Sequence, residues 1–175
     1  MIFLTVGTQF GFDRLVKAVD QCLESGMIDE EIIAQIGPGR YIPRCMESMV
    51  SLDRYAFDAM VRSCDAIVSH AGMGSITMAL NLGKPLLVMP RRRKYGEVVN
   101  EHQVDSARRF AQLGYVLVAY DDHEVATKIL RLKDFVPARR TPNRRGVIDR
   151  ITRHLSQRSD SKEDSRGLNA GGVIT

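Results

Sequence analysis

Short apolar runs, mostly of β-branched residues, alternate along this chain with segments of helical periodicity. Five runs are predicted to be strands: residues 2–6, 32–36, 66–69, 86–89 and 116–119. They do not alternate polar and apolar positions, which is typical of strands buried on both faces of a parallel sheet. Apolar positions at helical spacing fall within residues 12–23, 57–64, 76–83, 104–111 and 125–130. The pattern therefore predicts an α/β fold with a doubly wound parallel sheet, and Gly83 as a helix C-cap.

The domain organisation follows from where the apolar pattern ends. Residues 1–156 are predicted to form one domain, in which residues 146–155 could be a last helix. Residues 157–175 hold few large apolar side chains, so we expect a disordered polar tail. No apolar run approaches the ~20 residues of a membrane-spanning helix. The stretch "MIFLTVG" is too short for a signal-peptide core, and no basic segment precedes it. These features predict a cytoplasmic protein.

Charge and cysteine content exclude little by themselves. The net charge is +4, and basic residues gather in "RRRK" at 91–94 and between residues 131 and 153. Such a surface could simply be solvated, or could meet a membrane, a phosphate ligand, an acidic partner or nucleic acid. Aromatic residues are scarce and Trp is absent, so a stacking platform for nucleic acid is not expected. The cysteines lack metal-ligand spacing and no carboxylate cluster is evident, so no metal is expected; Cys22 and Cys64 fit the core.

Ligands of open parallel sheets bind at the carboxyl ends of the strands, on the loops that enter helices. The loop "HAGMGS" at 70–75 follows a strand and opens a helix. Gly72 and Gly74 let backbone N–H groups approach an anion, and the helix N-terminus adds about half a positive charge. Ser75 adds a hydroxyl, and His70 could donate a hydrogen bond. The alternative is a tight turn in which Ser75 is only the helix N-cap.

The first strand is followed by "VGTQFGFD", which has neither the dinucleotide fingerprint nor a P-loop. Thr8 could cap the next helix or contact a phosphate. The second strand ends in "QIGPG" rather than in the acidic residue that a nicotinamide cofactor requires, which argues against an NAD enzyme.

A long polar loop, "PRRRKYGEVVNEHQ", follows the strand at 86–89. Its donors and acceptors, among them Glu101, His102 and Gln103, suit a ligand with many hydroxyls such as a sugar. The alternative is a solvated helix start in which Asn100 is the cap and Glu101 favours the helix dipole.

With these motifs in order, "HAGMGS…ALNLGKPLLVMPR…YGEVVNEHQ" resembles the C-terminal domain of glycosyltransferase family 28, the nucleotide-sugar-binding half of GT-B enzymes. The likeness is greatest to small single-domain members, namely the catalytic subunits of eukaryotic dolichol-linked N-acetylglucosaminyltransferases and bacterial exopolysaccharide subunits of the PssE type. The opening stretch "MIFLTVGTQFGFDRLVKAVD" is also very like the latter. The resemblance covers about residues 1–130.

The resemblance implies a Rossmann-like half of a GT-B fold and specific residue roles. His70, Gly72 and Ser75 would hold the diphosphate of a UDP-sugar donor, with Gly74 in the same turn, and Thr8 would also contact phosphate. Further roles fall on the polar loop, where Gln103 would bind the sugar hydroxyls with His102 and Glu101 beside it. One departure is Met78, which stands where many relatives carry a Glu that binds the ribose hydroxyls.

Because GT-B sites lie between two halves, the resemblance implies a partner, a membrane-anchored acceptor-binding subunit that presents a lipid-diphosphate-linked acceptor. We expect a peripheral location at the inner membrane, an exopolysaccharide or capsule pathway, and inverting transfer without a metal or other cofactor and without nucleic acid. Two alternatives belong to other classes. One is a non-catalytic nucleotide-sugar-binding or regulatory module, and the other is an interaction protein that uses only its basic surface.

Overall fold

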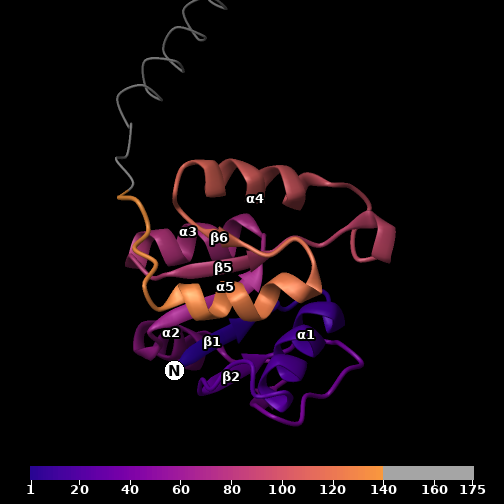
Figure 1. The fold of residues 1–175 in the computed structure, drawn as a ribbon. Helices are drawn as coiled ribbons and strands as arrows, with labels where there is room; N and C mark the ends of the chain where they lie inside the picture. The colour runs from indigo at the N-terminus through magenta and orange to yellow at the C-terminus, as the bar shows by residue number, and fades with distance from the viewer. Residues whose placement is uncertain (140–175) are drawn as a thin grey trace, which may run out of the picture. The chain divides into compact units, whose positions relative to one another are not determined.

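The computed structural model describes residues 1–139, which form one compact unit (Figure 1). Six parallel strands make a single sheet in the order β3-β2-β1-β4-β5-β6. The expected doubly wound parallel sheet is therefore confirmed. The predicted helix at 146–155 and the predicted tail at 157–175 lie outside the described residues.

The strands agree closely with the apolar runs. They span Ile2–Thr5 (β1), Ile32–Gln35 (β2), Glu47–Met49 (β3), Ala66–His70 (β4), Leu86–Met89 (β5) and Leu117–Val118 (β6). The sequence predicts all of them except β3. This strand has three residues, none of them fully buried, and it lies at the edge of the sheet beside β2. An edge strand of this kind lacks the continuous apolar run that marks the others.

The helices lie where the 3.6-residue periodicity places them. They span Asp13–Glu24 (α1), Arg54–Ser63 (α2), Met73–Leu82 (α3), His102–Gln112 (α4) and Val125–Leu132 (α5), with short 3₁₀ turns at Arg93–Tyr95 (η1) and Asp122–Glu124 (η2). Gly83 ends α3 in the left-handed conformation, as predicted, because a side chain is disfavoured there.

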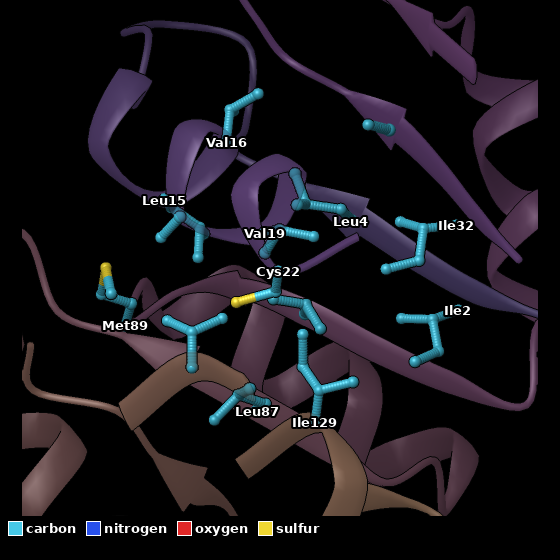
Figure 2. Packing of buried hydrophobic residues seen from close by; sticks show 14 of the residues in the cluster. Ile2, Leu4, Leu15, Val16, Val19, Cys22, Ile32, Leu87, Met89 and Ile129 are labelled. Carbon is cyan, nitrogen blue, oxygen red and sulfur yellow. The ribbon is translucent and has the colours of Figure 1, made fainter. Parts of the chain in front are cut away.

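Two hydrophobic clusters cover the two faces of the sheet. The first packs α1 and α5 on the sheet, and Figure 2 shows Val19 and Cys22 of α1 near Ile129 of α5. The second packs α2, α3 and α4 on the opposite side through Val61, Ile76 and other residues. Cys22 and Cys64 are buried and reduced within these clusters, as expected from their positions.

The topology determines where a site can form. β1 is hydrogen-bonded to both β2 and β4, so the connections leave β1 and β4 toward opposite faces of the sheet. The chain direction of the strands brings residues 6–12, 70–73 and 90–103 to the same carboxyl edge. A crevice at such a switch point is the usual ligand position in this type of sheet. Within residues 1–139, no helix is both long and apolar enough to cross a membrane.

Candidate functional site

The glycine turn after β4 opens α3 without a side-chain cap. Gly72 is the N-cap residue, the helix begins at Met73, and the first intrahelical bond of the turn runs from Ile76 N to Gly72 O. The N–H groups of Met73, Gly74 and Ser75 precede this bond and are therefore free to bind an anion. A Cβ added to Gly74 would meet no atom within 4 Å outside its own stretch of helix, so the groove beside the turn is open. The alternative in which Ser75 is the N-cap is wrong, because Ser75 lies inside the first turn.

The Ser75 hydroxyl is held by the end of β4. Its Oγ lies 3.0 Å from Oγ of Ser69, which donates to the carbonyl oxygen of Thr5 at 2.7 Å. Ser69 is fully buried. This chain of hydroxyls ties the first turn of α3 to both β4 and β1, and so fixes the orientation of the free N–H groups.

His70 stands at the junction of the two glycine-containing turns. A Cβ on Gly72 would collide with its Nε2, and a Cβ on Gly7 would lie 3.2 Å from its Cε1. Glycine is therefore required at both positions for the ring to fit between the turns. Nδ1 of His70 lies 3.2 Å from Ser69 Oγ, which orients the ring.

The His70 ring is neutral at pH 7. Burial first, and the positive charge of Arg91 second, lower the pKa of His70 to about 4, while a backbone hydrogen bond at Thr5 acts in the opposite direction. A neutral imidazole carries one N–H, and Ser69 Oγ gives its own hydrogen to Thr5, so Nδ1–H of His70 donates to Ser69. Nε2 then gains a proton to donate only when the ring becomes protonated. A bound anion would counteract both causes and favour the protonated form.

The first turn, after β1, is shaped by buried polar side chains. Gly7 has a φ of +81°, its N–H donates to Thr5 Oγ1 at 3.4 Å, and its carbonyl accepts from Gln35 Nε2 at 3.1 Å. Thr8 is exposed at this turn. The N-cap of α1 is Phe12 without a side-chain cap bond, so of the two roles considered for Thr8, capping is ruled out.

The polar loop after β5 carries the residues expected to bind a sugar. Gln103 Oε1 accepts from the N–H of Arg91 at 3.1 Å, so its amide –NH₂ is the part left for a ligand. Glu101 Oε1 accepts from the N–H of Arg93 at 3.0 Å. His102 is exposed in the first turn of α4. Asn100 accepts from the N–H of His102, but the N-cap of α4 is Glu101, so the expectation of Asn100 as the cap is wrong.

An ion pair braces this loop against α1. Nε and Nη2 of Arg14 donate to the two oxygens of Glu97 at 2.7 and 3.0 Å, and Nη2 also donates to Pro90 O. Glu97 accepts in addition from the N–H of Arg92 at 2.8 Å. Both charged side chains are mostly buried. The geometry is bidentate, so the pair fixes the orientation of the Glu97 carboxylate relative to Arg14 as well as the distance between them.

The stretch "RRRK" is not one exposed basic patch. Arg91 is 3% exposed, and Arg92 and Lys94 both pair with Asp121, at 3.3 and 3.7 Å. Interpreting all four residues as basic surface is therefore wrong for Arg91 and overstates the free charge of the others. Of the basic segment at 131–153, the structure describes only the first part.

Met78 lines an open groove along α3 with Met73, Gly74, Thr77, Asn81 and Leu82. The groove starts at the free N–H groups of the turn. Its polar side chains are Thr77 and Asn81, and Met78 offers no strong acceptor. Across residues 1–139, no cluster of three His, Cys, Asp or Glu side chains could hold a metal ion.

Two buried residues that shape the site, Arg91 and Gln35, were not predicted from the sequence. Gln35 is 1% exposed and supports Gly7. Arg91 follows β5 at the carboxyl edge, and this position is the signal that could have identified it. A basic run normally indicates exposed surface, and that expectation concealed it.

The fold of residues 1–139 matches the Rossmann-like half of GT-B glycosyltransferases. Structural similarity extends to MurG of Acinetobacter baumannii (TM-score 0.56, 17% identity, 77% of this chain and 42% of that chain). It extends also to a solution structure of ALG13 (TM-score 0.54, 19% identity, 83% and 91% covered). These identities support the fold alone.

Sequence comparison defines the family. The glycosyltransferase family 28 C-terminal domain matches residues 1–151, so the chain belongs to this family. It is homologous to human UDP-N-acetylglucosamine transferase subunit ALG13, with 32% identity over 125 residues, 66% of this chain and 10% of that protein. The Saccharomyces cerevisiae subunit of the same name is 42% identical over 52 residues, 30% of this chain and 24% of that protein. The chain thus spans about a tenth of the human relative.

Proposed function

We propose that this chain is the UDP-sugar-binding subunit of a two-chain inverting glycosyltransferase that acts on a lipid-diphosphate-linked acceptor in exopolysaccharide or capsule biosynthesis. The observation that carries the proposal is the uncapped first turn of α3, which faces open space at Gly74 and adjoins His70. A helix N-terminus with free N–H groups binds phosphate. Membership of the glycosyltransferase family narrows that anion to a nucleotide sugar.

The donor would lie across the three loops of the carboxyl edge. Its diphosphate would accept hydrogen bonds from the N–H groups of Met73, Gly74 and Ser75, with Thr8 facing it from the first turn. Its nucleoside would follow the groove of α3, where Thr77 and Asn81 take the place of the missing carboxylate at Met78. The sugar would meet the residues of the polar loop that remain available, Glu101, His102 and Gln103.

The reaction would be a single displacement at the anomeric carbon. The acceptor hydroxyl oxygen forms a bond to this carbon, the bond from the carbon to the phosphate oxygen breaks, and its electron pair leaves with UDP. The hydroxyl proton passes to a base. Free N–H groups and the helix dipole stabilise the charge that develops on the diphosphate. His70, beside the same turn, is the residue of this chain that we assign to leaving-group stabilisation.

The base and the acceptor site would come from a partner. The human relative is named as a subunit of a transferase, and this chain spans 34% of the solved glycosyltransferase SnogD from Streptomyces nogalater. A second, membrane-anchored α/β chain that binds the acceptor would complete the cleft and hold this chain at the inner membrane. No metal enters this scheme, because the N–H groups and the dipole take the role of a cation.

Two measurements test the proposal. Calorimetric titration of the chain with a panel of UDP-sugars should give binding, and absence of binding at millimolar ligand would leave only the alternative of an interaction surface. Mixing the chain with candidate membrane partners and a lipid-diphosphate-linked acceptor should then give sugar transfer. Binding without transfer for every partner would instead favour the non-catalytic nucleotide-sugar-binding module.

A further inference from the structure

Arg91 is a buried cation whose charge is offset only in part, by the Glu97 carboxylate that already pairs with Arg14. Arg91 is 3% exposed, and it takes part in none of the ion pairs among residues 1–139. Its Nε is buried and donates to no acceptor of the described residues. The guanidinium lies 5.0 Å from the centre of the Phe12 ring, which offers only partial compensation. Burial outweighs the attraction of Glu97 and lowers the pKa of Arg91, so this position favours the arrival of an anion.

The same side chain holds the first turn of the site. Nη2 of Arg91 donates to the carbonyl oxygens of Val6 at 3.0 Å and Phe10 at 2.8 Å. These two carbonyls bracket the turn that carries Gly7 and Thr8. The main-chain N–H of Arg91 donates to Gln103. One residue therefore connects the phosphate-facing turn after β1 with the sugar-facing helix α4.

The charge of Arg91 also reaches the other side of that turn. His70 packs against Gly7 and Gly72, and its remaining neighbours, Ser69, Ser75 and Thr5, are uncharged. Arg91 is the charged group whose field lowers the pKa of His70, in addition to burial. A positive potential is thus already present at the turns while His70 is neutral.

We propose that Arg91 is a positioning residue of the donor site, which holds the Val6–Phe10 turn in shape for a diphosphate and supplies the buried positive charge that the diphosphate compensates. The inference rests on the proposed function for the identity of the anion. It assigns no direct contact between Arg91 and the ligand. Two effects are separable, because the carbonyl bonds depend on the shape of the guanidinium and the potential depends only on its charge.

Three variants separate these effects. Arg91→Met removes both charge and hydrogen bonds while keeping much of the volume, and Arg91→Lys keeps the charge but not the two-carbonyl geometry. Arg93→Met removes an exposed charge from the same loop and is the matched control. Circular dichroism and thermal unfolding establish that each variant folds. If Arg91→Met does not fold, Arg91→Gln takes its place. This variant removes the charge but keeps a hydrogen-bond donor, and it is compared with Arg91→Lys in the same way.

The first readout needs no ligand. An NMR titration of His70 should show its pKa moving from about 4 toward its ordinary 6.5 in Arg91→Met and in Arg91→Gln. It should stay near the wild-type value in Arg91→Lys and Arg93→Met. An unchanged titration in folded Arg91→Met, or in folded Arg91→Gln where the Met variant does not fold, would overturn the electrostatic part of the proposal.

The second readout uses UDP-N-acetylglucosamine, UDP and uridine as probes. Relative to wild type, the dissociation constants of both diphosphates should rise about tenfold or more in Arg91→Met, about threefold in Arg91→Lys and less than twofold in Arg93→Met. Uridine lacks phosphate, so its dissociation constant should change little, and to the same extent, in all three variants. Equal weakening of uridine and UDP would show a purely structural role and overturn the proposal. Failure of the wild type to bind any probe would contradict the proposed function, and the His70 titration would still decide whether Arg91 sets the potential of the site.

Discussion

The main-chain N–H of Arg91 donates to Oε1 of Gln103 at 3.1 Å, across the polar loop that joins β5 to α4. The amide of Gln103 is therefore half occupied by the protein itself. Its oxygen anchors the start of α4, and its –NH₂ group is the part that can meet a ligand. If Gln103 binds the donor sugar, it acts as a hydrogen-bond donor to a sugar oxygen.

This division of the Gln103 amide can be tested with two substitutions. Gln103→Glu keeps an acceptor for Arg91 and loses the –NH₂ group, whereas Gln103→Ala loses both. We expect both variants to lose discrimination among UDP-sugars by about tenfold, with a smaller effect on UDP. Only Gln103→Ala should lower the melting temperature, by an amount corresponding to about 1 kcal/mol. Equal loss of UDP-sugar and UDP affinity in the alanine variant would remove Gln103 from the sugar site.

Gly74 gives a test of the phosphate turn that separates binding from folding. A Cβ at this position meets no protein atom within 4 Å outside its own stretch of helix, so Gly74→Val should fold with a melting temperature close to that of wild type. The added methyl groups would occupy the groove beside the free N–H groups, which Gly74 lines. We expect the dissociation constant for UDP to rise about a hundredfold, and Gly74→Ala to show a smaller rise. Normal nucleotide binding by a folded Gly74→Val would refute the anion site at this turn.

The buried neutral His70 predicts a pH dependence of stability. Its folded-state pKa of about 4 lies below the unfolded value, so the unfolded chain binds more protons between pH 6.5 and 4. The free energy of unfolding should therefore fall as the pH is lowered through this window, by up to about 3 kcal/mol from this group. Urea denaturation at several pH values measures the slope. His70→Gln should lack this part of the slope, and an identical slope in both proteins would contradict the assignment.

A protonated His70 would also strengthen anion binding. UDP-sugars carry both phosphates as esters, so the ligand itself does not titrate near neutral pH. Their affinity should increase as the pH falls from 7 toward 5, because the bound diphosphate raises the pKa of His70 from about 4. Calorimetry in buffers of different ionisation enthalpy should show proton uptake on binding in wild type and none in His70→Gln. Binding without proton uptake in wild type at pH 5 would contradict a His70 contact with the diphosphate.

Met78 allows a gain-of-function prediction. This residue lines the groove of α3 along which we propose that the nucleoside lies. Met78→Glu should strengthen UDP binding about tenfold, because a carboxylate accepts hydrogen bonds from two hydroxyls. Met78→Gln is the neutral control and should give a smaller increase in UDP affinity. The gain should shrink for dUDP, which lacks one hydroxyl, and no gain with UDP would show that the nucleoside does not lie along this groove.

The sequence was sufficient for most of the fold because the central strands and the helices have strong apolar periodicity. It missed β3, since a short half-exposed edge strand has no such signal. His70, Gly72, Gly74 and Ser75 could be placed together because a strand, a glycine turn and a helix follow one another locally. The position of Arg91 after β5 was readable, but its contacts were not, because its partners Val6 and Phe10 are 85 and 81 residues away along the chain.

The central claim is that the first turn of α3 binds the diphosphate of a nucleotide sugar. Titration of ¹⁵N-labelled protein with UDP-N-acetylglucosamine, followed by amide NMR spectra, tests it most directly. We expect the largest shifts at the amides of Met73, Gly74 and Ser75, moved downfield as they donate to phosphate, with smaller shifts at Thr8 and Gln103. Saturating binding that leaves these three amides unmoved, or no shifts at millimolar ligand, would contradict it.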